Sequence, residues 1–349
     1  MKIAVIGAGF TGLAASFILA KDGHDVSIFE RDQDPGGLAI GYKEKDWEWT
    51  LEKHYHHWFT NDHSILALAK EIDYEVLIRR PKTSVYTGGE IYQLDSPISV
   101  MRFPKLSVLE RIRMSAVLAA LKFDPIWKPL EKFNAATILP KAMGKKAYEM
   151  IWEPLLVNKF GSFATDVSLA WFWARIYKRT PSLAYPSKGY LSFAKFLSKT
   201  IEDNNANIYL NTEIQSLTTK GNDVIISFSK DKKKESLRFD KAIVTTPSPL
   251  FVKIAPQLPT SYTATLAKLK SLGAINLVLR LSKPFFTDNT YWLSVCEKTS
   301  PIMAIVEHTN FMDKKHYNNE HIVYLGNYLQ REHKYFTMSE EQILKAYDP

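Results

Sequence analysis

Residues 1–37 read MKIAVIGAGFTGLAASFILAKDGHDVSIFERDQDPGG, and this stretch decides the fold. The apolar run KIAVI is typical of a short buried parallel strand, and the turn GAGFTG that follows it leads into a helix expected over residues 13–21. A side chain at Gly9 would block the approach of a phosphate to backbone N–H groups, and one at Gly12 would push the helix away from the strand. The pattern predicts a unit that binds the pyrophosphate of a dinucleotide.

The second predicted strand, residues 25–30, ends in an acid. Glu30 follows Gly12 by 18 positions, close to the roughly 20 at which a carboxylate holds ribose hydroxyls in such units. A glycine-rich turn alone is weak evidence, but here strand, turn, helix, second strand and acid occur in order. We therefore expect Glu30 to bind an adenosine ribose without a 2′-phosphate.

Length and composition indicate an ordinary globular protein. The chain has 349 residues, which suggests about two domains, with 46% hydrophobic and 23% charged residues. Cys296 is the only cysteine, so no intrachain disulfide can form; a buried thiol and a reducing, cytoplasmic location are expected.

The net charge of +8 comes from dispersed lysines, apart from the run at residues 230–234 (KDKKK). That run lies between two strand-like segments, so we interpret it as a solvated hairpin tip and predict no nucleic-acid partner. Residues 3–20 carry no charge, but their phosphate-turn glycines argue against a signal peptide or membrane span. Peripheral contact with a membrane stays open.

The order of the predicted elements indicates a discontinuous first domain. Helices are expected from Ser107 onward and over residues 142–156, 169–177 and 191–202, with a hairpin at 84–94. Three strands at 208–210, 224–229 and 237–239 form an expected meander, and residues 241–245 return to the parallel sheet. Strands at 275–281, 303–306 and 322–325 indicate an antiparallel sheet, and a helix is expected to begin near Ser339.

The continuation after Glu30 identifies a family resemblance. Arg31 follows directly, and Gly36-Gly37-Leu38 comes after a short spacer. This segment resembles that of the flavin amine oxidoreductase superfamily, in particular protoporphyrinogen oxidase-like and phytoene desaturase-like bacterial members. The resemblance implies FAD and an α/β fold, in which an FAD/NAD(P)-binding, Rossmann-like domain of the glutathione reductase type carries an inserted α+β substrate domain.

The resemblance also implies domain bounds and cofactor contacts. The FAD domain is expected at 1–78 and 186–256, the substrate domain at 79–185 and 257–338, and residues 339–349 as the start of a C-terminal segment. The residues expected to bind the cofactor are Gly7, Ala8, Gly9, Phe10, Thr11, Gly12, Glu30, Arg31, Gly36, Gly37, Leu38, His56 and Ile214.

Further segments resemble the same subgroup. They are residues 152–156 (WEPLL), 159–161 (KFG), 187–190 (SKGY), 212–214 (TEI) and 307–310 (EHTN). The third of these opens the helix before the meander, and Ile214 corresponds to a residue that packs near the FAD adenine. The sequence supplies no role for the EHTN segment.

Two departures from the family pattern matter. Amine oxidases have a lysine that reaches the flavin through water on the strand after residues 272–273, where this chain has Asn276 and Leu277. We therefore expect simple amines to be poor substrates. The family also ends with a glycine- and acid-containing segment that contacts the ribityl chain, and this sequence stops before it, so we expect the chain to be a fragment.

The catalytic residues are not identified by any pattern. His54, His56, His57 and His63 lack the spacing of a metal site, and no metal is predicted. Either His56 or His57 is a candidate to face the flavin ring, as are Tyr291 and Trp292. The aromatic residues 171–173 and the helix near Ser107 either line an apolar tunnel or form core, and core is favoured.

The implied activity is hydride removal from a C–N or C–C bond of a small or apolar substrate. The alternatives are a UDP-galactopyranose mutase-like isomerase, an NAD-dependent dehydrogenase, and a non-enzymatic prenyl- or lipid-binding protein on the same fold. The sequence leaves the substrate, the electron acceptor and the oligomeric state undetermined.

Overall fold

The structure is a computed structural model that describes residues 1–230 and 233–348. The chain forms two compact units, and each collects segments that are distant in sequence. Unit 1 comprises Met1–His56, Ser64–Leu77 and Tyr185–Lys270, and unit 2 comprises His57–His63, Ile78–Ala184 and Ser271–Pro349. The assignment of cofactor and substrate roles to domains stays a prediction.

Unit 1 is built on a parallel four-stranded sheet in the order β10-β2-β1-β14. Its strands are β1 (Lys2–Ile6), β2 (Asp25–Phe29), β10 (Asn207–Tyr209) and β14 (Lys241–Val244). β1 and β2 are apolar and buried beyond their first residues, as expected for strands covered on both faces. The predicted return of the chain to this sheet at β14 is confirmed.

One predicted strand belongs elsewhere. Residues 208–210 were expected in the meander, but β10 pairs in parallel with β2, with Ile208 opposite Ile28. The antiparallel meander consists instead of β11 (Glu213–Lys220), β12 (Asp223–Lys230) and β13 (Lys233–Phe239). A strand's length and composition do not reveal its partner, which tertiary packing determines.

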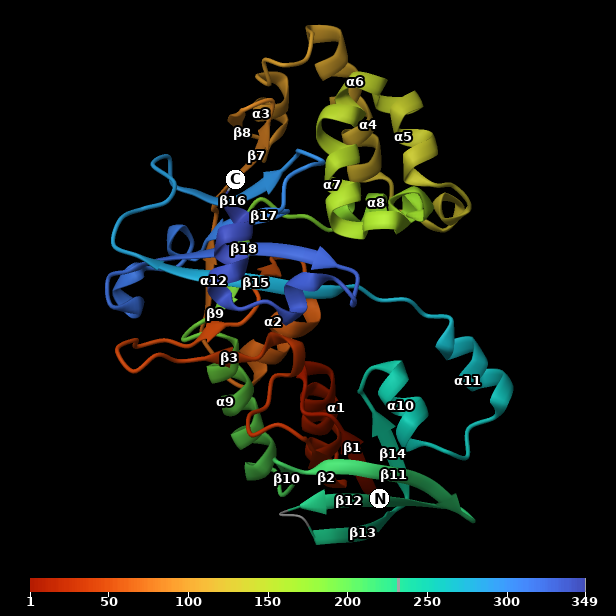
Figure 1. Cartoon of the computed structure of the whole chain (residues 1–349). Coiled ribbons are helices and arrows are strands. Elements are labelled where there is room, and N and C mark those ends of the chain that lie inside the picture. The colour runs from red at the N-terminus through yellow and green to blue at the C-terminus, as the bar shows by residue number, and fades with distance from the viewer. Residues whose placement is uncertain (231–232, 349) are drawn as a thin grey trace. The chain divides into compact units, whose positions relative to one another are not determined.

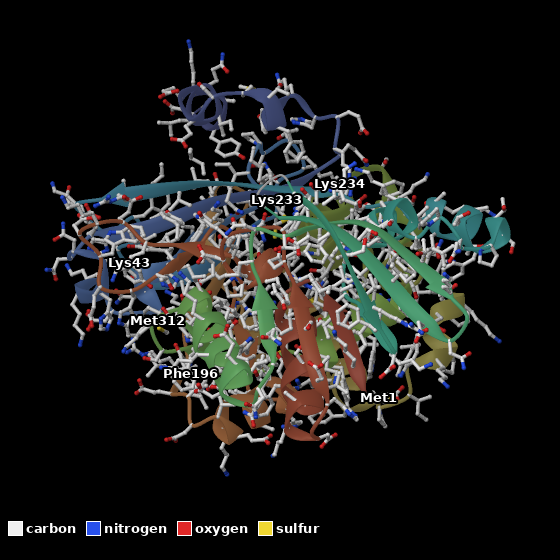
Figure 2. The ribbon with its side chains drawn as sticks, turned by 90° about the horizontal axis from the view of Figure 1, so that it is seen from below. Met1, Lys43, Phe196, Lys233, Lys234 and Met312 are labelled. Atoms are coloured by element: carbon white, nitrogen blue, oxygen red, sulfur yellow. The ribbon has the colours of Figure 1, made fainter. Side chains whose placement is uncertain are left out.

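The meander and the parallel sheet share a hydrophobic core. Ile6, Phe29, Phe228 and Phe239 lie in one buried cluster, and the Phe29 ring centroid is 5.2 Å from that of Phe228. The predicted hairpin tip falls partly on residues 231 and 232, which lie outside the described residues. Lys233 and Lys234 are exposed where β13 begins (Figure 2).

Helices complete unit 1. They are α1 (Phe10–Lys21), α2 (His63–Glu71), α9 (Tyr190–Asp203), α10 (Ser248–Ile254) and α11 (Thr260–Ala267), with the short strands β3 (Gly41–Tyr42) and β4 (Leu51–Glu52). α1 begins at Phe10 rather than at the expected residue 13, because Gly9 already serves as its N-cap. Phe10 stacks on Phe193 of α9 with ring centroids 5.5 Å apart.

Unit 2 contains a six-stranded sheet in the order β15-β18-β17-β16-β7-β8. The strands are β7 (Lys82–Thr87), β8 (Glu90–Gln93), β15 (Gly273–Leu281), β16 (Thr290–Val295), β17 (Ala304–Glu307) and β18 (His321–Leu329). The predicted hairpin around residues 88–89 and the predicted antiparallel strands are confirmed. β16 pairs with β7 in parallel, so the sheet is mixed.

The remaining strands are short. β5 (Trp58–Phe59) pairs antiparallel with β9 (Leu183–Pro186), and β6 spans Val76–Arg79.

A helical layer belongs to unit 2, as the labelled helices in Figure 1 show. It comprises α3 (Pro97–Met101), α4 (Val108–Phe123), α5 (Ala135–Met143), α6 (Lys145–Ala147), a π-helical turn (Tyr148–Trp152), α7 (Glu153–Phe160) and α8 (Leu169–Tyr177), and α12 (Glu340–Tyr347) comes later. Ser107 and Glu110 form a capping box that starts α4. Of the apolar residues of α4, Val108 and Ile112 are exposed, whereas Met114 is buried.

Two sequence expectations concern the chain as a whole. Cys296 is buried as expected, and burial raises the pKa of its thiol to about 12. Among the described residues, no helix combines the length and the apolar character that crossing a bilayer requires.

Candidate cofactor and substrate sites

The glycine turn of unit 1 has the geometry that a phosphate requires. Gly7 has a φ of 103°, and an added Cβ at Gly12 would lie 2.0 Å from the Gly7 carbonyl oxygen. Gly12 therefore permits the close contact of α1 with the strand end. The first N–H groups of α1 have no acceptor within the helix, so the N-terminus of α1 is suited to an anion.

Gly9 is a glycine for a different reason. Its φ is −69°, which any residue adopts, and an added Cβ would meet only the Gly37 Cα at 3.6 Å. The protein itself thus leaves room for a side chain at this position. A cradle that a Cβ would fill is what a pyrophosphate at the helix N-terminus requires, so these residues fit the group.

The second glycine pair packs directly on the first turn. The Gly36 N–H donates to the Ala8 carbonyl oxygen at 2.9 Å, and Gly36 has a φ of 128°. A Cβ on Gly37 would lie 2.9 Å from the Gly9 Cα. The structure therefore brings together two glycine segments that the sequence separates by more than 20 residues.

Glu30 lies beside the same turn, at the end of β2. Its two carboxylate oxygens accept hydrogen bonds from the backbone N–H groups of Ala8, at 2.8 Å, and Asp32, at 3.0 Å. These bonds fix the orientation of the side chain. A carboxylate has about four acceptor positions, so capacity for ribose hydroxyls is left.

The other predicted contacts differ in how their side chains lie. Thr11 and Arg31 are exposed, and Leu38 is 91% exposed. The Phe10 ring packs toward α9, so only its backbone belongs to the phosphate turn. Ile214 lies on β11 and packs against the meander core. The roles of these residues stay predictions.

His56 lies in unit 1. Its Nδ1 is 2.5 Å from the His54 carbonyl oxygen, and its ring is 5.6 Å from the Tyr190 ring. Burial lowers the pKa of His56, which favours the neutral imidazole.

Among the described residues, no three side chains of the histidine, cysteine, aspartate or glutamate type gather as a metal site would require.

Sequence reasoning missed two threonines that follow β14. The Thr245 hydroxyl donates to the Ile6 carbonyl oxygen at 3.0 Å, and a Cβ on Gly7 would lie 2.8 Å from the Thr245 Oγ1. The Thr246 hydroxyl is buried and has no partner within the described part of the chain. Their place directly after a buried parallel strand, where ligands of such sheets bind, was the available signal.

Unit 2 contains a cavity of about 430 Å³, within the range typical of small-molecule sites. α4 supplies Ser115, Leu118, Ala119, Lys122 and Phe123, so the helix near Ser107 lines this cavity as well as packing in the core. His57, Tyr291 and Trp292 line it too. The remaining lining residues are Arg80, Pro81, Thr83, Leu94, Asp95, Ser96, Pro97, Val100, Trp152, Ile176, Arg179, Thr180, Pro181 and Leu183.

His57 rather than His56 is placed against the two predicted aromatic residues. Its Nδ1 is 3.2 Å from the Tyr291 hydroxyl oxygen, and its ring meets the Trp292 ring at 82° with centroids 5.9 Å apart. One polar part of the cavity wall is therefore an imidazole and a phenol. Such a pair can orient a substrate and hold or pass on a proton.

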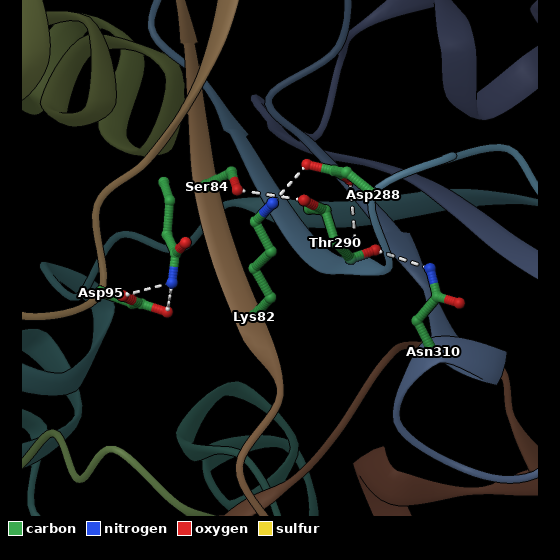
Figure 3. A network of polar contacts seen from close by, with 7 residues as sticks. Lys82, Ser84, Asp95, Asp288, Thr290 and Asn310 are labelled. Carbon is green, nitrogen blue, oxygen red and sulfur yellow. Dashed lines mark hydrogen bonds and ion pairs between the residues drawn. The ribbon is translucent and has the colours of Figure 1, made fainter. Parts of the chain in front are cut away.

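A polar network fixes the strands that carry this wall (Figure 3). Lys82 pairs with Asp288 at 2.5 Å, and the Ser84 and Thr290 hydroxyls are 3.1 Å apart between β7 and β16. The Asn310 amide donates to the Thr290 carbonyl oxygen at 2.9 Å. Because Thr290 immediately precedes Tyr291, this network sets the position of the cavity's aromatic edge.

The EHTN segment, residues 307–310, has a structural role. Glu307 is fully buried, accepts hydrogen bonds from the N–H groups of Phe285 and Phe286, and lies 2.9 Å from His321 Nδ1. His308 Nε2 is 2.9 Å from the Tyr317 hydroxyl, and burial lowers its pKa to about 3. The segment therefore ties together the loops and strands at one edge of the sheet.

Residues 10–349 match the family of flavin-containing amine oxidoreductases. A "Probable zeta-carotene desaturase" of Synechococcus elongatus is 32% identical over 107 residues, which are 30% of this chain and 21% of that protein. A 4,4'-diapophytoene desaturase of Staphylococcus aureus is 62% identical over 37 residues, 11% of this chain and 7% of that protein. The matches thus span less than a quarter of either relative.

Three solved structures share the fold. An oxidoreductase from Methanosarcina mazei has a TM-score of 0.76 and 18% identity, with 99% of this chain and 83% of that chain covered. Reduced UDP-galactopyranose mutase gives 0.72 and 16%, with 99% and 77% covered, and putrescine oxidase bound to putrescine gives 0.71 and 15%, with 98% and 78% covered. These likenesses confirm the expected α/β fold with its Rossmann-like domain of the glutathione reductase type.

Proposed function

This chain belongs to the flavin-containing amine oxidoreductase family, and from that premise we propose that it removes a hydride from a C–N or C–C bond of a small, largely apolar substrate. The family implies FAD as the cofactor. When bound, FAD supplies the hydride acceptor, so the protein's task is to hold the cofactor, position the substrate and exclude water.

The residues of unit 1 fit the adenosine and pyrophosphate parts of this cofactor. The N–H groups at the start of α1 and the space above Gly9 would hold the pyrophosphate, and Glu30 would accept hydrogen bonds from the ribose hydroxyls. Ile214 would pack near the adenine. We extend the proposal to the glycine pair at 36–37 and to His56, whose burial favours a neutral ring.

The observation that carries the substrate class is the 430 Å³ cavity of unit 2. Leu94, Val100, Leu118 and Phe123 contribute apolar surface to it, while His57 and Tyr291 form a polar pair at one side. Transfer of an apolar substrate from water to such a cavity is favourable, and the polar pair would fix the orientation of the substrate.

The experiment is anaerobic reduction of the purified protein. We expect a flavin absorption spectrum, and bleaching of that spectrum by at least some members of a panel of apolar amines and unsaturated hydrocarbons. Protein that retains no flavin after reconstitution would contradict the proposal and favour an NAD-dependent or non-enzymatic reading.

A mutase-like isomerase is the second candidate. It is favoured by the fold shared with reduced UDP-galactopyranose mutase and by the basic residues Arg80 and Arg179 in the cavity lining. Such an enzyme would carry flavin but show no net redox turnover. Measuring product formation against consumption of an electron acceptor separates the two candidates.

We further propose that the partner is a small molecule rather than a nucleic acid, since the lysines are dispersed along the sequence apart from the run at residues 230–234. Cytoplasmic location and peripheral contact with a membrane remain proposals.

A further inference from the structure

A second, smaller cavity of unit 2 contains two cations. It measures about 100 Å³ and is lined by residues of α7, α8 and strands β16 to β18. Lys159 of α7 and Arg175 of α8 both line it. Hydrophobic and aromatic side chains such as Leu156, Trp171 and Phe172 form much of the remaining wall.

Neither cation has an acidic partner among the described residues. The groups that influence the Arg175 charge are the Arg179 guanidinium, the Cys296 thiol and the Tyr328 hydroxyl, and no carboxylate acts on it. Lys159 Nζ lies 4.2 Å from the centre of the Tyr328 ring, and the charge that acts on it is that of Arg175. Two like charges thus face one small cavity.

This arrangement is unfavourable without a counter-ion. Burial lowers the pKa of Lys159 to about 8, with a smaller contribution from Arg175, and burial lowers the pKa of Arg175 to about 9, with a smaller contribution from Arg179. Partly buried charges that repel one another cost free energy. An anion between them would make the electrostatic free energy of the site favourable. The ring of Tyr328 stabilises Lys159 but cannot satisfy its N–H donors.

The small cavity adjoins the large one. Trp152 and Trp292 line both, so the two cavities share a wall. The Trp152 indole N–H is buried and has no acceptor in the described part of the chain. A third donor without a partner therefore lies where the cavities meet.

We infer that the small cavity binds the anionic end, a carboxylate or a single phosphate, of the substrate whose apolar body fills the large cavity. The inference rests on the proposed function and specifies its substrate class. At 100 Å³, below the roughly 300 Å³ at which pockets enclose a whole drug-sized ligand, the cavity takes a group rather than a molecule. Arg175 would bind the two oxygens in a bidentate manner, and Lys159 would add a point charge.

The test is calorimetric titration of the full chain with three probes that share an alkyl body: octanoate, octyl phosphate and octanol. We expect at least one of the two anions to bind more tightly than octanol. Replacing Arg175→Gln or Lys159→Gln should weaken binding of that anion by roughly 10- to 100-fold, the effect of losing a charged hydrogen bond. Octanol affinity should be unchanged.

Control variants separate the site from general charge effects. Lys145→Gln removes an exposed lysine that pairs with Glu149 at 3.7 Å on a neighbouring helical segment, and it should leave all three affinities unchanged. Arg175→Lys keeps the charge but removes the bidentate fork, so it should fall between wild type and Arg175→Gln. It also keeps the test usable if Arg175→Gln does not fold.

Equal affinities for octanol and both anions, no binding of either anion, or anion binding that ignores both substitutions would each overturn the inference. The preferred anion distinguishes a carboxylate from a phosphate. Because the experiment measures binding rather than turnover, failure of this inference is separable from failure of the proposed function. Anion binding without flavin reduction would contradict only the proposed function.

Discussion

The carboxylate of Glu30 stabilises the local backbone and, we propose, also binds the cofactor. It anchors the N–H groups of Ala8 and Asp32 and would also accept bonds from the adenosine ribose. Glu30→Ala should weaken FAD binding by about tenfold to a hundredfold, which corresponds to the loss of about 1.5–3 kcal/mol for a charged hydrogen bond.

Fluorescence titration of the flavin measures this effect. Asp32→Ala is a matched control, since Asp32 is an exposed acid whose side chain pairs only loosely with Arg31 at 3.6 Å. Unchanged FAD affinity in Glu30→Ala would show that another group holds the ribose.

The buried carboxyl group of Glu52 should make the stability of the fold depend on pH. Its side chain is 1% exposed, accepts hydrogen bonds from the Tyr185 hydroxyl and the Tyr190 N–H, and burial raises its pKa from 4.5 to about 7. The folded state therefore binds this proton more tightly than the unfolded state does. Its contribution to stability, on the order of 3 kcal/mol, is complete below pH 4.5 and is lost as the pH rises through 7.

Thermal melting at intervals from pH 5 to pH 8 tests this sign. The wild-type melting temperature should fall by several degrees more than that of Glu52→Gln, whose side chain is neutral throughout. Parallel pH profiles for the two proteins would refute the assignment.

At the residue scale, the sequence predicted what motifs encode and missed what only three-dimensional proximity creates. The spacing of Gly9, Gly12 and Glu30 reflects direct backbone demands, so these residues were recognisable. Arg175 and Thr246 belong to no motif. Their significance depends on the absence of a partner within the described residues, and a sequence does not state which side chains meet.

At the scale of elements, the two glycines at the start of α1 have different roles: Gly12 permits packing within the protein, and Gly9 leaves space for the phosphate. Gly12→Ala should destabilise the fold by about 3 kcal/mol or more, because its Cβ would lie 2.0 Å from a backbone oxygen that cannot move independently. Gly9→Ala should change stability by less than about 0.5 kcal/mol and yet abolish retention of FAD, because its Cβ would occupy only the phosphate's space.

Urea unfolding combined with flavin-to-protein ratios after desalting measures both properties for each variant. Full flavin occupancy in a folded Gly9→Ala protein would be incompatible with a pyrophosphate at this turn.

The EHTN segment gives a prediction for the sheet of unit 2. Glu307→Ala would leave the N–H groups of Phe285 and Phe286, and the His321 ring, without their buried acceptor. We expect a loss of about 3–5 kcal/mol, because each buried donor left without an acceptor costs about 1–3 kcal/mol. The exposed pair of Glu90 and Lys105, at 2.9 Å, provides the comparison: Glu90→Ala should have little effect in the same denaturation assay, because solvent screens an exposed pair.

Local patterns predicted elements better than their partners. The run KAIVT and the capping box at Ser107 are local signals, and β14 and α4 occur where those signals place them. The three residues of β10 do not distinguish it from a meander strand, so its parallel pairing with β2 could not be inferred. The polar strand β11 escaped detection because its residues alternate without a clear apolar face.

For the whole molecule, both units are assembled from three separated segments, so neither the cofactor turn nor the cavity lining is encoded in one continuous stretch. The glycine turn draws on residues 7–12, 30, 36–37 and 245, and the large cavity draws on residues from 57 to 292. Motif reading recovers the first apart from Thr245, because its other parts are recognisable patterns. It does not recover the second, whose members share only their location.

At the scale of the whole chain, β15 and the lining of the large cavity both bear on which substrates are oxidised. Amine oxidases of this family place a lysine on the strand where this chain has Asn276 and Leu277, both on β15, and the large cavity of unit 2 offers much apolar surface. Simple mono- and polyamines carry a positive charge at neutral pH, which is costly to desolvate. The three cations Arg80, Arg179 and Lys122 in the lining outnumber the single acid Asp95 and would repel that charge. Anaerobic mixing with such amines should therefore reduce the flavin far more slowly than mixing with an apolar or acidic substrate of similar size. Rapid, stoichiometric bleaching by any common amine would show that this chain oxidises amines without that lysine.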